Sequence, residues 1–368
     1  MGLLGGVKQV SSVRDFLFTP RILFLALAVV FVGVNVNQST VQNPILTQAS
    51  SGSSQGGSGA ALADAALLDV PPRRMWGWGA GMNGYCGETS IQSAGIFFGN
   101  YWSQERVRYA DGNEELLIGV NDVKAAKALK LDYEAWDYER KKTPQASEFL
   151  SWIKNHINQG HPVVAGWYEK QPRGDEDYDH IMPIIGYEDV SRLVRDADGK
   201  LVAVPTSTNI YHNDLYLQET SITLGKDAFK SRKGCSQSKS PVQPYDYCLP
   251  DEYDYGLAIK GNVDPNKETF RTFLTVSIWT EPDWGAEDKK HEKPIQFTAF
   301  ATVTGLTPGK KYALLRFDKA DDLGDSKNFL QKKWAKKYEF VADSDTYVYE
   351  DLDPMMSDGT YFFRCVEA

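Results

Sequence analysis

The sequence NGYCGETS, residues 83–90, contains a cysteine in a setting that predicts both local structure and chemistry. Cys86 follows the Gly- and Trp-rich run MWGWGAGMNGY and precedes an apolar segment that stops at Gly99-Asn100. This pattern predicts a loop and then a helix that begins near Cys86. Free amides at a helix start and the helix dipole both favour a thiolate. We therefore expect Cys86 to be a nucleophile of lowered pKa, although a cysteine among aromatic residues is also compatible with a small buried hydrophobe.

A histidine follows in the sequence HPVVAGWYEKQPRGDEDYDHIMPIIGYED, residues 161–189. Its two apolar runs, 162–167 and 181–187, predict adjacent strands joined by a polar, acidic loop. His180 lies at the beginning of the second strand. A histidine in that place can take a proton from a thiol and later protonate a leaving group.

Residues 211–216, YHNDLY, provide two further candidates, because either Asn213 or Asp214 can orient an imidazole. Strand alternation puts these two side chains on opposite faces, so only one of them can meet His180. The apolar pattern of the segment does not choose between them.

Taken together, Cys86, His180 and the Asn213-Asp214 pair resemble the papain-like cysteine peptidases over residues 75–220. The resemblance is closer to the bacteriocin-processing, double-glycine peptidases, in which Cys-Gly opens the helix and "DH", an apolar strand and "GY" carry the histidine. It implies an α+β fold, with a helical half followed by an antiparallel sheet, and a cysteine hydrolase, most simply a peptidase, without a cofactor or metal. It favours Asp214, because double-glycine peptidases use Asp and the Ser-Trp that follows the papain Asn is absent here.

The chain departs from this family ahead of the cysteine. Members usually carry a Gln there as an oxyanion-hole donor, but residues 80–85 contain none. Asn83 is the only side-chain amide nearby, and with the Cys86 backbone amide it is the candidate oxyanion site. Three readings stay open: a peptidase, a Cys-His acyltransferase or amidase, and an inactive relative that serves as a secreted or cell-surface binding module.

The N-terminal region predicts a membrane-targeting segment. Residues 22–36, ILFLALAVVFVGVNV, are nearly all apolar, and Lys8, Arg14 and Arg21 precede them. This asymmetry predicts a cytosolic leader over residues 1–21 and a signal anchor or signal peptide over 22–36. A Gly/Ser-rich linker follows over 37–72. We expect a single-pass type II membrane protein with the rest of the chain outside the cytosol, or a secreted one.

Beyond the linker we expect a peptidase-like domain over residues 73–290 and a small β-sandwich over 291–368. Helices are predicted over 103–109, over 121–131 and from Thr143-Pro144 to Gly160, and a hairpin over 192–204. The C-terminal part is rich in aromatic and β-branched residues, with strands predicted over 295–303, 312–317, 337–342 and 360–366. There Tyr312 follows a turn that resembles a tyrosine corner, in which the hydroxyl anchors the loop behind it.

The charge of the chain limits which classes of partner it can bind. The net charge of −9 argues against nucleic acid as a partner. The acidic residues of loop 175–179 suggest a peptide or protein substrate with basic residues and a more protonated His180.

In a secretory compartment Cys235 and Cys248 are natural disulfide partners, which leaves Cys86 free and Cys365 buried in the last strand.

Overall fold

The computed structural model describes residues 65–75, 84–170, 180–215, 219–223, 228–231, 235, 246–277, 280 and 293–368. The predicted leader, the apolar segment 22–36 and the linker up to residue 64 lie outside the described residues, as do Asn83 and the acidic loop 175–179. Among the helices of the described ranges, none is long and apolar enough to cross a membrane.

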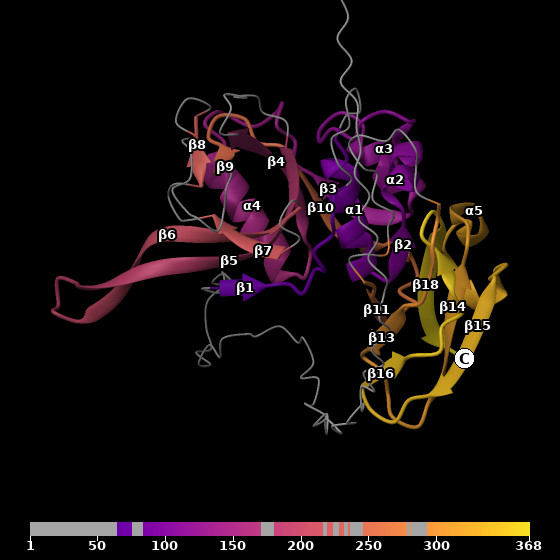
Figure 1. Cartoon of the computed structure of the whole chain (residues 1–368). Helices are drawn as coiled ribbons and strands as arrows, with labels where there is room; N and C mark the ends of the chain where they lie inside the picture. Colours follow the sequence, from indigo (N-terminus) through magenta and orange to yellow (C-terminus); the bar gives the residue numbers. More distant parts are fainter. Residues whose placement is uncertain are drawn as a thin grey trace, which may run out of the picture. The chain divides into compact units, whose positions relative to one another are not determined.

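Strands outnumber helices in the described residues, and the fold is mixed α and β (Figure 1). The helices are α1 (Cys86–Phe97), α2 (Gln104–Asp111), α3 (Asp122–Ala128), α4 (Ala146–Asn158), α5 (Ala320–Leu323) and the 3-10 turn η2 (Phe329–Gln331). The predicted helix that begins near Cys86 is confirmed. The helix predicted from Thr143 begins instead at Ala146, and Thr143 does not cap it.

The main sheet has the strand order β3-β10-β4-β5-β6-β7, and each of these neighbours is antiparallel. Its strands are β3 (Leu131–Ala135), β10 (Gly256–Asn262), β4 (Val163–Lys170), β5 (His180–Arg195), β6 (Leu201–Asp214) and β7 (Glu219–Thr223). Off this order, β1 (Ala65–Leu67) pairs with β5, β9 (Asp246–Pro250) pairs with β4, and β8 (Phe229–Lys230) pairs with β9. The predicted pairing of the strands on either side of the acidic loop is therefore confirmed.

The far ends of β5 and β6 continue as a two-stranded hairpin (Figure 1). Its turn forms at Asp196, whose Oδ1 accepts hydrogen bonds from the backbone amides of Asp198 and Lys200. This confirms the predicted hairpin over 192–204.

Helix α1 lies within the core, and each of its twelve residues is buried. Gly87 is required by this packing, because a Cβ there would lie 2.6 Å from Leu116 Cδ2 and 2.8 Å from the Leu116 carbonyl oxygen. Helix α4 is amphipathic instead. It buries Phe149, Ile153 and Ile157, spaced at i, i+4 and i+8, which is the apolar stripe of an amphipathic helix packed on a core.

Two further sheets share a second buried cluster, and they have the orders β11-β13-β16 and β15-β14-β18-β2. Their strands are β11 (Arg271–Thr275), β13 (Phe300–Thr304), β16 (Thr346–Tyr349), β15 (Lys336–Val341), β14 (Lys311–Phe317), β18 (Thr360–Glu367) and β2 (Asn100–Trp102). The short strands β12 (Gln296–Phe297) and β17 (Met355–Met356) pair beside them. Two of these strands, β2 and β11, precede residue 291, so the sheets extend beyond the C-terminal range named from the sequence.

The turn before β14 has the geometry that the tyrosine-corner resemblance implies. The Tyr312 hydroxyl accepts a hydrogen bond of 2.8 Å from the Thr307 amide, five residues earlier. The predicted disulfide between Cys235 and Cys248 is also confirmed, with Cα atoms 5.9 Å apart. Cys86 and Cys365 take no part in a disulfide, and both are buried.

Candidate active site

Cys86 is the first residue of α1, and only 2% of it is exposed. Its thiol contacts the backbone amide of Ile181, the second residue of β5. The Ser90 hydroxyl reinforces this junction, because Oγ lies 2.8 Å from the Cys86 carbonyl oxygen and 3.2 Å from the Ile181 carbonyl oxygen. The helix start is thereby fixed against the beginning of the strand that carries His180.

The expected lowering of the Cys86 pKa is wrong for this conformation. Burial raises the pKa of the Cys86 thiol, and the nearby Glu88 carboxylate raises it further. The backbone amides of Ile181 and Gly87 oppose this rise but are outweighed. A helix start stabilises a thiolate by about 0.3–1 kcal/mol when it is solvent-exposed, whereas desolvation of a fully buried charge shifts a pKa by several units. The thiol is therefore protonated in the resting protein.

His180 opens β5, as predicted, and lies opposite Trp167 of β4. Its ring stacks on Tyr247 with centroids 5.6 Å apart, and only 1% of the residue is exposed. Burial, and then the nearby His212, lower the pKa of His180 to about 3. The imidazole is thus neutral, in contrast to the more protonated state expected from the sequence.

His212 is the residue at this site that the sequence did not indicate. It is fully buried, with its ring 5.0 Å from Trp167 and 5.5 Å from Tyr247. The Asn213 backbone is near enough to oppose the effect of burial on its pKa, but burial outweighs it. Burial lowers its pKa to about 3. Its only sequence signal is its place directly before Asn213-Asp214.

The register of β5 and β6 shows which of Asn213 and Asp214 lies on the same face of the sheet as His180. Ile184 pairs with His212, and alternate residues of a strand share a face. His180 and Ile184 therefore lie on the face that carries His212 and Asp214. The Trp167–His212 ring contact agrees, since Trp167 is the cross-strand neighbour of His180.

Asn213 lies on the opposite face, where its amide has structural partners. Nδ2 donates to the Val70 carbonyl oxygen at 2.9 Å, and the Thr220 hydroxyl donates to Oδ1 at 3.0 Å. Both contacts connect β6 to its neighbours rather than to the His180 face. Asp214 is fully buried on the face of His180.

Residues 67–213 match the model of the Peptidase_C39 like family. Over this part of the chain, the match confirms the resemblance to the papain-like cysteine peptidase superfamily, and it supports a cysteine hydrolase. It contains Cys86, His180 and Asn213 and ends one residue before Asp214.

Two solved structures of the cysteine protease Cwp84 are similar to the chain at a low level. The clostridial protease after propeptide cleavage has 11% identity and a TM-score of 0.29, over 82% of this chain and 81% of that chain. The protease and lectin-like domains of Cwp84, a surface layer associated protein of Clostridium difficile, have 9% identity and a TM-score of 0.28, over 82% and 73%. No curated protein matches the chain.

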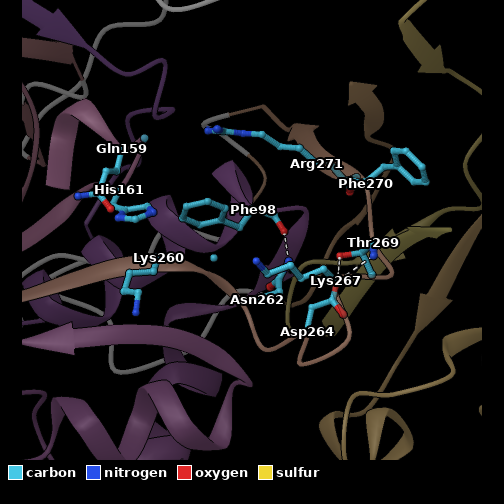
Figure 2. Close-up of a pocket in the computed structure, with 13 residues that line it drawn as sticks. Phe98, Gln159, His161, Lys260, Asn262, Asp264, Lys267, Thr269, Phe270 and Arg271 are labelled. Atoms are coloured by element: carbon cyan, nitrogen blue, oxygen red, sulfur yellow. Dashed lines mark hydrogen bonds between the residues drawn. The ribbon is translucent and has the colours of Figure 1, made fainter. Parts of the chain in front are cut away.

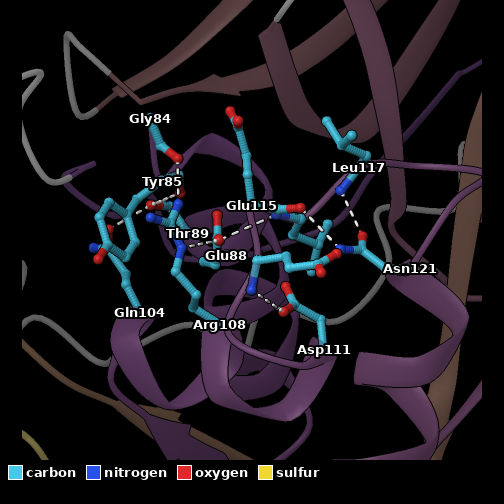
Figure 3. A network of polar contacts seen from close by, with 12 residues as sticks. Gly84, Tyr85, Glu88, Thr89, Gln104, Arg108, Asp111, Glu115, Leu117 and Asn121 are labelled. Carbon is cyan, nitrogen blue, oxygen red and sulfur yellow. Dashed lines mark hydrogen bonds and ion pairs between the residues drawn. The ribbon is translucent and has the colours of Figure 1, made fainter. Parts of the chain in front are cut away.

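Within the peptidase-like region, a buried ion pair holds the segment before Cys86 (Figure 3). Glu88 is fully buried, and its Oε1 accepts from Arg108 Nε at 2.7 Å and from the Leu116 amide at 3.2 Å. Arg108 also donates to the Gly84 carbonyl oxygen at 2.5 Å, and its guanidinium lies 3.5 Å from the centre of the Tyr85 ring. One arginine of α2 therefore fixes both residues that precede the cysteine.

Proposed function

We propose that the protein is a cysteine hydrolase acting on peptide bonds, with Cys86 as nucleophile, His180 as general base and acid, and Asp214 as the residue that orients His180. The observation that carries this proposal is the contact between the Cys86 thiol and the Ile181 amide, directly beside His180. The shared face of His180 and Asp214 supports the third role, and the family match supports the chemistry.

The resting charges determine how the first step proceeds. Because Cys86 is a neutral thiol and His180 a neutral imidazole, the thiol proton moves to His180 as Sγ attacks the carbonyl carbon. The new oxyanion accepts hydrogen bonds from the Cys86 amide and from Asn83. His180 then gives its proton to the leaving nitrogen, and water, activated by the same imidazole, hydrolyses the thioester.

A second candidate is an inactive relative that serves as a binding module. It is favoured by the 2% exposure of Cys86 and by its raised pKa, since a buried neutral thiol is also the state of a structural cysteine. Acyl transfer or amide hydrolysis by the same groups is a third outcome, and product analysis distinguishes it from peptidase activity.

The location and the preference for basic substrates are also part of this proposal. Residues 22–36 would anchor the chain in a membrane as a type II protein, or target it for secretion, with the peptidase-like region outside the cytosol. Residues Asp175, Glu176, Asp177 and Asp179 would attract basic side chains near His180. N-terminal sequencing of the mature protein and cleavage of basic against acidic peptides at low salt test these two parts.

Cleavage of a mixed peptide library, followed by mass spectrometry, tests the proposed function. We expect products from the wild type, none from Cys86→Ala, and a loss of at least about 100-fold in kcat/KM for Asp214→Ala. Asn213→Ala should lose stability, by about 1–3 kcal/mol for its two broken hydrogen bonds, while the folded fraction keeps its activity. Activity that survives Asp214→Ala but disappears in folded Asn213→Ala would reverse the assignment. Cleavage by Cys86→Ala would refute the proposal.

A further inference from the structure

A pocket of about 290 Å³ lies at the C-terminal end of α1, where β10 ends and β11 begins (Figure 2). Phe98, the residue after α1, is part of its wall. Cys86 is at the other end of this twelve-residue helix, about 18 Å away at 1.5 Å per residue. The pocket is therefore separate from the candidate active site.

Basic side chains dominate this pocket. Lys260, Lys267, Arg271 and His161 line it, against one carboxylate, Asp264. The Asp264 oxygens already accept from the Glu268 amide and from the amide and hydroxyl of Thr269, at 2.7–3.0 Å. Lys260 has a partial partner outside the pocket wall, Asp132, at 3.7 Å. With His161 neutral, the lining has three cations and one carboxylate, and Asp132 beside Lys260 offsets part of the remaining positive charge.

The state of His161 agrees with a positive field in the pocket. Burial lowers the pKa of His161 to about 4, and His156, Lys260 and Arg271 lower it in addition, while Asp132 raises it slightly. The neutral imidazole can still donate one hydrogen bond. Its Nδ1 lies 3.3 Å from His156 Nδ1, and the ring is part of the pocket wall.

Arg271 is the side chain of the pocket that points most clearly to an anionic ligand. Its guanidinium lies 4.9 Å from the centre of the Phe97 ring and 4.8 Å from that of Phe273, so aromatic rings hold its plane in place. Among the described residues it has neither a carboxylate nor a hydrogen-bond acceptor. Arg271 is exposed to solvent and stays charged at neutral pH. A fixed arginine fork without an acceptor is preorganised to bind an oxyanion through two parallel hydrogen bonds.

We propose that this pocket binds a doubly charged tetrahedral oxyanion, namely a phosphate or sulfate group. The excess positive charge of the lining favours the −1.5 to −2 charge of a phosphate monoester near pH 7 over the single charge of a carboxylate. The volume is just below the range usual for ligand sites, roughly 300–1,000 Å³, and suits only a small phosphorylated or sulfated ligand. Phe98 provides an apolar wall for the part of the ligand next to the anion. This proposal is independent of the proposed hydrolase function.

Calorimetric titration of the full chain with inorganic phosphate, and separately with inorganic sulfate, tests the proposal at constant ionic strength. Acetate is the comparison, because it carries one charge. We expect both dianions to bind at least about tenfold more tightly than acetate. Lys267→Gln and Arg271→Gln should each weaken dianion binding by about tenfold or more, and Arg271→Lys by less. Lys142→Gln, an exposed lysine outside the pocket, is the control and should bind as the wild type does.

Three results would overturn the site. The first is that the wild type binds neither dianion. The second is that acetate binds as tightly as phosphate. The third is that Lys267→Gln and Arg271→Gln both bind phosphate as the wild type does. Lys267 is exposed, so its replacement should not affect folding, which keeps the test valid even if Arg271→Gln is unstable. Binding by Cys86→Ala at wild-type affinity would show that the pocket works separately from the thiol. Preference for one dianion identifies which group the pocket recognises.

Discussion

Replacing Arg108 by alanine should destabilise the protein strongly and disturb the segment that presents Cys86. The change removes the hydrogen bonds to Glu88 and Gly84 and the cation over the Tyr85 ring. It leaves Glu88, whose side chain is 0% exposed, without its cation. Breaking a buried ion pair in this way costs about 3–5 kcal/mol, a large part of the 5–15 kcal/mol by which domains are usually stable.

The cost of Arg108→Ala should depend on pH, with a sign set by Glu88. Burial already raises the pKa of Glu88, and Arg108 counters part of that rise. Without Arg108, the folded-state pKa of Glu88 is higher still, so the folded variant binds a proton that the unfolded chain releases above about pH 4.5. The penalty is therefore small near pH 5 and grows toward pH 8.

Urea denaturation at pH 5 and at pH 8, with an equal m-value required for each variant, measures this penalty. Lys141→Ala is the control, because its ion pair with Glu148 is largely exposed and is worth about 0–1 kcal/mol. The double variant Arg108→Ala/Glu88→Gln should recover part of the loss, as coupled residues do in a double-mutant cycle. A loss below about 1 kcal/mol at pH 8, or a loss that does not change with pH, would refute the reasoning.

Two further predictions concern buried titratable groups. Asp254 is fully buried, has no hydrogen-bond partner for its carboxyl among the described residues, and burial raises its pKa to about 8. Its contribution to stability falls as pH rises from about 4 to 8. In urea denaturation, Asp254→Asn should therefore be more stable than the wild type at pH 8 and little different at pH 4. An equal dependence of stability on pH in the two proteins would contradict this. His212 has the opposite sign, because its lowered pKa makes the unfolded chain bind more protons between about pH 6.5 and 3. His212→Phe should therefore lose less unfolding free energy on acidification than the wild type does, by up to about 1.4 kcal/mol per pH unit. The same dependence of unfolding free energy on pH in both proteins would exclude the effect.

Local patterns were sufficient for the elements that carry the candidate site. The helix start at Cys86, the strand that begins at His180 and the hairpin over 192–204 each follow from a short run of apolar, turn or capping residues. The disulfide of Cys235 with Cys248 also follows from local spacing. These features depend on residues that are close in sequence, which is why a single sequence predicts them.

Features that depend on distant contacts were not predictable. Burial of Cys86 results from packing of α1 against β5, so the direction of its pKa was wrong when only the helix start was considered. Arg108 meets Glu88 across twenty residues, and neither residue has a pattern that indicates the pair. Strand β2 pairs with β18, where Asn100 is opposite Phe362, although more than two hundred residues separate them. The strand faces of Asn213 and Asp214 relative to His180 became clear only from the register of β5 and β6.

The central claim, that Cys86 acts as a nucleophile with His180 as its base, is tested most directly by intact-protein mass spectrometry with a peptide chloromethyl ketone. The account predicts one covalent adduct per chain, mapped to Cys86 by peptide analysis, absent in Cys86→Ala and at least about tenfold slower in His180→Ala. Cys365, which is likewise outside any disulfide and buried but lies in β18, should remain unmodified. An unmodified Cys86, equal labelling of Cys365, or an adduct that forms at the same rate without His180 would contradict the claim.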